Sequence, residues 1–293
     1  MFASLFAAAI VLWMDTLVAL LELSAQESEN THAILVIPIA ISLIWLNRGK
    51  IFRDVSLGLV SGPILLASGI ALRILCSFFQ ASIGIENSLS ISILSLVLVC
   101  IGVFALAYGT RAVAAAQFPL VMLGFIVPFP SYVVRWINLG LQYGSTVAVD
   151  WLLYLAGVPF HRDGFVILLP LRSIEIAEQC SGIRAAIILF ILSMVVAHLY
   201  LRTMVLRTLL VAASVPISII KNGLRILALC LLSNYADPEI LESEFHRHSG
   251  MVFFAISIMA LYFSTLVLKW IEKRKQQRSS ASQRRIDHSP ACV

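Results

Sequence analysis

Long apolar stretches separated by short polar connections run along almost the whole chain, a pattern that is typical of a membrane protein with several spanning helices. A helix that crosses the hydrocarbon core of a bilayer needs about 20 largely apolar residues. On this criterion the pattern predicts about eight transmembrane helices, of which the second is short and is expected to extend towards Thr31. They fall at residues 1–23, 33–47, 57–76, 89–108, 113–130, 182–200, 206–233 and 250–270.

One long region, from about residue 128 to residue 179, lies outside these predicted spans. Residues 136–156 within it are amphipathic, because Gln142 and Asp150 are set among Leu, Val and Tyr. This pattern predicts a helix that lies in the membrane interface.

The same region continues with β-branched and aromatic residues on both sides of Arg162-Asp163-Gly164, which predicts a β-hairpin with its turn at these residues. The fold class expected from the whole pattern is an all-α polytopic membrane protein. A small extracytoplasmic segment, made of the amphipathic helix and the hairpin, precedes the sixth predicted helix.

Composition agrees with a membrane protein and excludes a soluble globular one. Hydrophobic residues make up 60% of the 293 residues and charged residues 13%, whereas a soluble domain carries roughly 25% charged residues. No basic segment precedes the first apolar stretch, so we expect a retained helix there and not a cleavable signal peptide.

The distribution of positive charge predicts the orientation of the helices. Most of the net charge of +5 comes from the residues after Trp270, and such a cluster marks a cytoplasmic end, with no nucleic-acid partner expected. With this tail inside, alternation leaves thirteen Lys and Arg in cytoplasmic segments and five outside. Both termini are therefore expected in the cytoplasm, in a multi-pass protein of the cell inner membrane. Residues 1–270 form the predicted transmembrane domain and residues 271–293 a basic, disordered tail.

Three polar residues meet at the outer face in this topology. Cys180 lies at the outer start of the sixth predicted helix, Arg225 towards the outer end of the seventh, and His246 just before the outer start of the eighth. Polar residues in or beside a bilayer are costly and usually functional. A thiol, a guanidinium and an imidazole supply the nucleophile, the fixed positive charge and the proton shuttle of a cysteine acyl-transfer site.

Neighbouring residues support this interpretation of Cys180. The positive end of a helix dipole favours the thiolate, and Arg184 adds to that field on the same helical face. Glu178 could hold the loop or pair with Arg184 or Arg225.

The seventh predicted helix carries further polar residues. Asn222 shares a helical face with Arg225 and indicates a polar interior there, while Lys221 has no role that the sequence assigns. Arg73, without polar company in its helix, is expected to extend to the headgroups.

The other cysteines do not suggest a second site. Cys76, Cys100 and Cys230 lie among Leu and Ala inside helices, and Cys292 lies in the tail. With no Cys-x-x-Cys spacing, a disulfide scaffold is not expected. His246 and His248 raise the alternative of a metal site, but no third ligand stands at a useful spacing, so neither a metal nor another cofactor is predicted.

At this point the motifs resemble those of the exosortase/archaeosortase family of membrane cysteine transpeptidases. The likeness covers most of the chain, and the order of its three polar motifs is specific. These motifs are Glu178-x-Cys-Ser-Gly-Ile-Arg184, Asn222-x-x-Arg225 and His246-x-x-x-Gly250. Further similar segments are Thr31-His32 to Pro38, Phe118-Pro-Leu120, Val127 to Pro130, Leu141-Gln142, and Leu155 to Gly164.

The resemblance implies Cys180 as nucleophile, Arg225 as transition-state stabiliser and His246 as acid/base, with Glu178, Arg184 and Asn222 in support. It implies exported protein substrates that end in a short Pro-containing motif, a transmembrane helix and a basic cluster, which are cleaved and passed to an unknown acceptor. His248 leaves the choice of histidine open.

Two other functions stay open. Lys221, Arg225 and Asp150 could line the polar pathway of a transporter or channel, although that gives no reason for Cys180 at a helix start. The chain could also be an assembly protein for an exported exopolysaccharide that acts by binding alone. Loss of substrate maturation in a Cys180→Ala variant would distinguish the enzyme from both.

Overall fold

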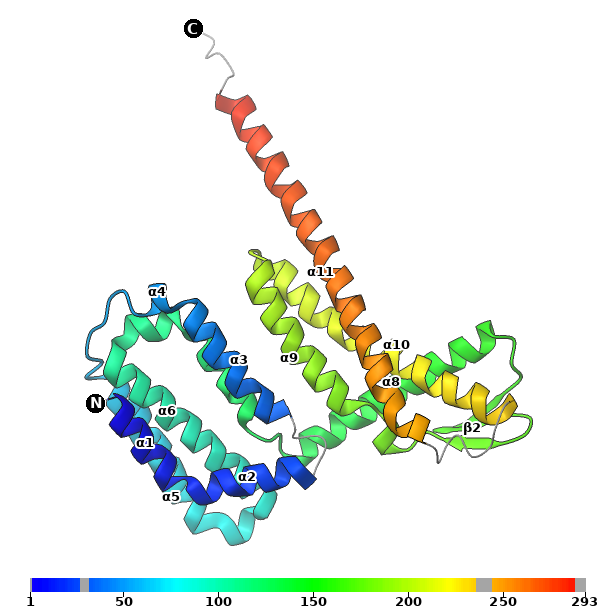
Figure 1. Cartoon of the computed structure of the whole chain (residues 1–293), viewed down its shortest axis with the longest axis horizontal. Helices are drawn as coiled ribbons and strands as arrows, with labels where there is room; N and C mark the ends of the chain where they lie inside the picture. Colours follow the sequence, from blue (N-terminus) through cyan, green and yellow to red (C-terminus); the bar gives the residue numbers. More distant parts are fainter. Residues whose placement is uncertain (1, 27–31, 236–243, 288–293) are drawn as a thin grey trace. The chain divides into compact units, whose positions relative to one another are not determined.

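The computed structural model describes residues 2–26, 32–235 and 244–287, and these are mostly helical (Figure 1). The chain divides into two compact units, Met1–Arg135 and Trp136–Val293. Thr31, towards which the second span was expected to extend, lies outside the described residues.

Unit 1 consists of helices. Its longest pair, α5 and α6, pack against each other along their length. Arg73 on α5 donates from Nη1 to Ser92 Oγ on α6 at 2.8 Å. Arg73, which has no polar company in its own helix, thus finds a polar partner on the neighbouring one, and its extension to the headgroups stays a prediction. The helices of this unit are α1 (Phe2–Leu12), α2 (Met14–Gln26), α3 (His32–Leu46), α4 (Arg48–Ile51), α5 (Ser61–Ile83), α6 (Ile85–Ala115), α7 (Gln117–Met122) and the 3₁₀ turn η2 (Leu123–Ile126).

Unit 2 carries the predicted site. Helix α8 begins at the end of unit 1 and leads into three short strands, a 3₁₀ turn and three long helices (Figure 1). These elements are α8 (Ser131–Leu155), β1 (His161–Asp163), β2 (Val166–Leu168), β3 (Ser173–Glu175), η3 (Glu178–Cys180), α9 (Ile183–Tyr200), α10 (Met204–Tyr235) and α11 (Glu244–Asp287).

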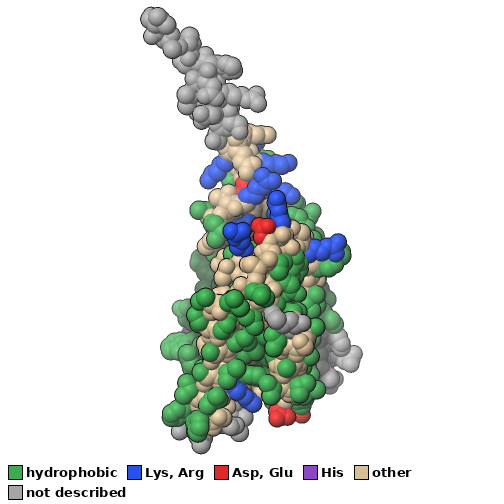
Figure 2. Space-filling model, turned by 90° about the vertical axis from the view of Figure 1, so that its left-hand side faces the viewer, with side chains coloured by type: hydrophobic (Ala, Val, Ile, Leu, Met, Phe, Trp, Pro, Cys, Tyr) green, Lys and Arg blue, Asp and Glu red, His purple; other side chains and the backbone are tan. Residues whose placement is uncertain are grey.

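The all-α polytopic prediction is confirmed, with fewer clear spans than eight. Among the described residues, five helices are long and apolar enough to cross a membrane, or up to seven if two bent pairs each count as one span. The pairs are Phe2–Leu12 with Met14–Leu23, bent by 64°, and Gln117–Ile126 with Ser131–Leu155, bent by 93°. The remaining predicted span is α3, whose 15 residues cover only about 22 Å at 1.5 Å per residue. Much of the surface in Figure 2 is hydrophobic, as lipid contact requires.

The predicted amphipathic helix is confirmed as α8, but its polarity is the reverse of that in a soluble protein. Asn138, Gln142, Ser145 and Thr146 are buried against the protein, while aromatic side chains such as Trp136 are exposed. The reversal has a simple cause: in a membrane protein the surroundings are apolar, so hydrogen-bonding side chains gain most by facing inwards.

The predicted hairpin is also present and carries a third strand that the sequence pattern did not reveal. Strand β1 pairs with β2 so that Asp163 lies opposite Val166, which leaves Gly164 and Phe165 as the turn. The turn predicted at Arg162-Asp163-Gly164 was therefore placed too early, because Arg162 and Asp163 still pair within the strand. Gly164 adopts a φ of +60°, a conformation that glycine accepts at little cost. Strand β3 then pairs antiparallel with β2.

An ion pair connects the hairpin to α8. Arg162 Nη1 on β1 lies 2.7 Å from Asp150 Oδ2, and the Arg162 guanidinium lies over the Tyr143 ring at 5.7 Å.

Helices α9, α10 and α11 pack together around a cluster that includes Leu189, Leu210 and Leu261. The carboxylate of Glu272 on α11 accepts hydrogen bonds from Thr203 N at 2.7 Å and Arg202 N at 3.1 Å, just before α10 begins. It therefore caps the amides at the start of α10, where the helix dipole favours a negative charge. Helix α11 continues to Asp287, so the tail that was expected to be disordered is helical as far as that residue.

Candidate functional site

Cys180 lies in a short loop between the small sheet and α9. Strand β3 ends at Glu175, and η3 turns the chain so that Cys180 N donates to Ala177 O at 2.9 Å. Gly182 then takes the left-handed conformation, with φ +74° and ψ 22°, and α9 begins at Ile183. Cys180 is thus placed just ahead of the positive end of α9.

Asn222 on α10 holds this loop. Its Nδ2 donates to Cys180 O at 2.7 Å, with Ser181 O at 3.1 Å and Ser145 Oγ at 3.0 Å as further acceptors. Asn222 is 1% exposed, so water does not compete for its hydrogens. Buried hydrogen bonds of this kind are costly to break, since each buried polar group left unpaired lowers the stability of the fold by about 1–3 kcal/mol.

The buried polar face of α8 supports the loop from another element. Ser181 Oγ donates to Asn138 Oδ1, and Gln142 Nε2 donates to Ile176 O at 2.6 Å. The chain on either side of Cys180 is therefore bonded to α8. Because Ser145 on α8 also accepts from Asn222, the three elements α8, α10 and the Cys180 loop share one network.

Gly182 leaves no room for a side chain at this junction. A Cβ there would lie 2.9 Å from Asn222 Oδ1 and 3.4 Å from Lys221 Nζ. Lys221, which the sequence could not assign, is 5% exposed and places its ammonium beside this loop. No carboxylate of the described residues lies within ion-pair distance of Lys221.

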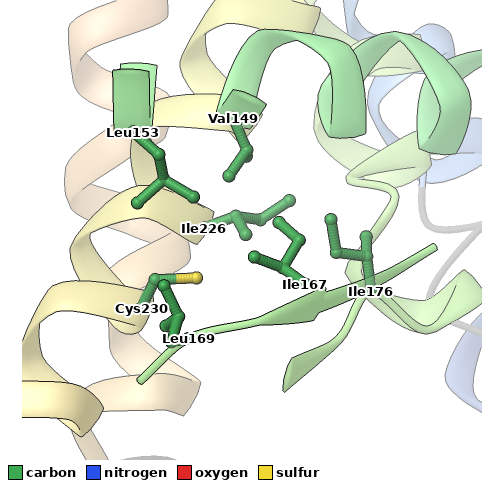
Figure 3. Packing of buried hydrophobic residues seen from close by; sticks show 7 residues of the cluster. All are labelled: Val149, Leu153, Ile167, Leu169, Ile176, Ile226 and Cys230. Carbon is green, nitrogen blue, oxygen red and sulfur yellow. The ribbon is translucent and has the colours of Figure 1, made fainter. Parts of the chain in front are cut away.

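A hydrophobic cluster underlies the loop (Figure 3). Cys180 packs against this cluster, which includes Ile167 and Ile176 from the region of the sheet and Ile226 from α10. Arg225 immediately precedes Ile226 and lies one turn beyond Asn222 on α10. The structure thus brings the Cys180 loop to the segment of α10 that carries Asn222 and Arg225.

The two supporting charges beside Cys180 lie at the surface. Glu178 and Arg184 are both exposed, and Glu178 forms no ion pair with another described residue. The suggested pairing of Glu178 with Arg184 or Arg225 is therefore not present, because the carboxylate remains available to solvent.

The two candidate histidines both lie in the first turns of α11, which begins at Glu244. Their side chains lie outside the described residues. Positions two residues apart on a helix are separated by about 200° at about 100° per residue, so the expectation that only one of the two histidines faces Cys180 stays a prediction.

None of the other described cysteines is part of this loop, although Cys230 belongs to the cluster against which Cys180 packs. Cys76 contacts Ser88 Oγ at 3.4 Å in unit 1, and Cys230 is buried in the cluster of Figure 3. The four cysteines in the described part of the chain are free thiols. Across the described ranges, no group of three or more His, Cys, Asp or Glu side chains is arranged to hold a metal ion.

Sequence reasoning missed Asn138, Ser145 and Ser181 as parts of the network. A signal existed on α8, since Asn138, Gln142 and Thr146 recur at every fourth position. The sequence analysis used only Gln142 and Asp150 from this helix, whereas the structure turns Asn138, Gln142 and Thr146 into the protein, with Asn138 bonded to the Cys180 loop.

Comparison with known proteins identifies a family. The family model for transmembrane exosortases (Exosortase_EpsH) matches residues 24–263, a range that includes Cys180, Asn222, Arg225 and His246. The resemblance found in the motifs is thereby confirmed. Neither the curated proteins nor the solved structures gave a match.

Gly182→Ala is expected to lower the melting temperature of the purified protein in detergent. The left-handed backbone costs of order 1–3 kcal/mol for a residue with a side chain, and the new methyl would displace Asn222. Gly140→Ala on α8 is the matched control, because a Cβ there meets nothing within 4 Å and alanine favours a helix by roughly 0.5–1 kcal/mol. Equal melting temperatures for the two variants would contradict the packing at Gly182.

Proposed function

Because the chain belongs to the transmembrane exosortase family, we propose that it is a sortase-like cysteine transpeptidase embedded in the membrane. It cleaves the C-terminal sorting tail of exported proteins and transfers them to an acceptor. The observation that carries this proposal is the clamp from Asn222 to Cys180 O at 2.7 Å. The clamp supports a shared site because it ties the nucleophile loop to α10 one turn from Arg225.

The reaction has two acyl-transfer steps. The Cys180 thiolate attacks the scissile carbonyl, and the resulting oxyanion is stabilised by the Arg225 guanidinium. His246 gives a proton to the departing amine as the C–N bond breaks, which leaves a thioester on Cys180. A nucleophile of the acceptor loses its proton to His246 and attacks the thioester, and the thiolate leaves.

Positive charge around the loop suits both steps. The start of α9 lies beside Cys180 together with Arg225 one turn beyond Asn222, and positive groups there stabilise the negative charge that develops on the carbonyl oxygen. Burial strengthens these interactions because the local dielectric is lower than that of water.

The transport alternative loses support from the contacts of Asp150. In a polar pathway this carboxylate would face Lys221 and Arg225 of α10. Asp150 instead binds Arg162 of the small sheet at 2.7 Å, with both side chains about a quarter exposed, at 23% and 27%.

The exported substrates and the acceptor are part of the proposal, and the resemblance in the motifs supports them. A protein that ends in a short motif, a membrane helix and a basic cluster would present the motif at the membrane surface. There Cys180 could reach it.

Cys180→Ser is expected to abolish maturation of a reporter that carries such a tail while leaving the protein folded in the membrane. A hydroxyl has a far higher pKa than a thiol and is a poor nucleophile without strong activation. Cys76→Ser is the control, since the same substitution in unit 1 leaves the site intact. Maturation can be followed as a shift in reporter mass, and full maturation by Cys180→Ser would exclude the nucleophile role.

His246→Ala is expected to stop maturation, whereas His248→Ala should stay within about tenfold of the wild-type rate. Two positions that are two residues apart on a helix are about 200° apart, so we expect only one of the two histidines to face Cys180, and a residue on the other face tolerates substitution. Rates on the same reporter decide the matter. An inactive His248→Ala beside an active His246→Ala would reverse the assignment, and two inactive variants would favour a metal.

We place both termini in the cytoplasm of the inner-membrane protein, with Cys180 on the opposite side. This orientation requires eight crossings, so α3 must cross despite its 15 residues, and residues 113–130, which precede α8, must cross as the sequence predicts; seven spans would put the termini on opposite sides. A short hydrophobic helix can cross where the bilayer thins. The positive residues Arg48, Lys50 and Arg53 follow α3, as expected for a helix that ends on the cytoplasmic side. Reporter fusions at each terminus test this: both should be active in the cytoplasm, and an N-terminal fusion active only outside would contradict it.

A further inference from the structure

Five aromatic side chains form a stripe along the outer face of α8. They are all strongly exposed, from 59% for Tyr143 to 74% for Trp136 and Tyr154. At about 100° per residue, the five positions fall within an arc of roughly 100° around the helix. The aromatic stripe consists of Tyr132, Trp136, Tyr143, Trp151 and Tyr154.

The direction of this stripe is set by the opposite face of α8. Asn138, Gln142 and Ser145 bond to the Cys180 loop, the preceding chain and Asn222. Helix α8 therefore cannot turn to bury its aromatics without breaking the network that holds the loop. The stripe faces outwards as a fixed part of the site's framework.

The composition of the stripe fits one kind of partner. Trp and Tyr are enriched where a membrane meets water, because their rings are apolar and their N–H or O–H groups remain hydrated. Arg135, also exposed, adjoins Trp136 and carries a charge that suits headgroup phosphates.

The length and composition of α8 also suit a helix in the membrane interface better than a helix that crosses the membrane. Its 25 residues would reach about 37 Å, long enough to span a bilayer. Yet α8 does not qualify as a span by itself among the described helices, only together with Gln117–Ile126, from which it is bent by 93°. Helix α8 alone thus lacks the uniformly apolar length of a spanning helix, and its separate polar and aromatic faces are those of a helix that lies along the membrane surface.

We propose that α8 lies flat in the headgroup region of the bilayer, with the aromatic stripe inserted at the boundary with the acyl chains. Its partner is the phospholipid surface. The hydrogen bonds that join Asn138 to Ser181 and Gln142 to Ile176 then hold Cys180 at a fixed depth in the membrane. This depth is next to where the sorting motif of a tailed substrate leaves the membrane. Only this last consequence, which concerns the substrate, rests on the proposed function.

Depth-dependent fluorescence quenching by brominated lipids tests the proposal. The full chain is reconstituted in phosphatidylcholine vesicles with bromines either near the top or near the end of the acyl chains. In separate variants the other tryptophans become Phe, which leaves Trp136, Trp151 or Trp13 alone. Trp13 is the control, because its ring is buried, at 5% exposure.

Trp136 and Trp151 should both lose more fluorescence to the shallow bromines than to the deep ones, with depths that agree within about 5 Å. Trp13 should respond little to either. The two residues are about 22 Å apart along the helix axis, so depths that differ by more than about 10 Å would mean that α8 crosses the membrane. Absence of quenching at both would show that water or protein covers the stripe.

A second arm separates lipid from a substrate helix as the occupant. Addition of a synthetic tail peptide should leave the quenching of Trp136 and Trp151 unchanged. If the peptide abolished the quenching, the stripe would bind the substrate and the proposal would be overturned. None of these measurements needs catalysis, so an inactive protein would refute the proposed function without affecting this test.

Discussion

The placement of Cys180 depends on the carboxamide of Asn222. This side chain is almost fully buried, and its amino group has the Cys180 and Ser181 carbonyls and the Ser145 hydroxyl as acceptors. In an apolar environment such a group strongly favours the conformation that satisfies it. The conformation of the loop, the left-handed Gly182 and the closeness of α10 to α8 all depend on that requirement. Arg225 gains its position from the same contact, since it is one turn further along a helix that Asn222 fixes.

The network explains why α8 has its polar side inwards. Hydrogen bonds to Ser181 and Ile176 give Asn138 and Gln142 partners that lipid could not supply. The aromatic stripe is the other consequence, because the remaining face must suit the membrane. Helix α8 therefore contacts the Cys180 loop with one face and is proposed to contact the membrane with the other.

Much of this architecture could be predicted from the sequence, and the exceptions have physical causes. Apolar length located α5, α6, α9, α10 and α11, but it cannot separate a short span such as α3 from a buried helix. Periodicity located α8 but not its inner face, since the rule that polar residues face outwards holds only in water.

The site was predictable to the extent that its residues carry a local signal. Asn222 and Arg225 stand out on an apolar helix, and Cys180 stands out before one. The contacts of Asn138 and Ser145 could not be predicted, because their partners are 43 and 77 residues away in the chain. The roles of His246 and His248 stay predictions.

The most direct test of the account is to isolate the covalent intermediate. The protein would be incubated with a tailed substrate in the absence of acceptor, acid-quenched, digested and analysed by mass spectrometry. The account predicts that the substrate's cleaved carboxyl end is attached to the peptide containing Cys180, as a thioester that neutral hydroxylamine removes. Cleavage that proceeds with the acyl group on another residue, or with no covalent adduct under conditions that preserve thioesters, would contradict it.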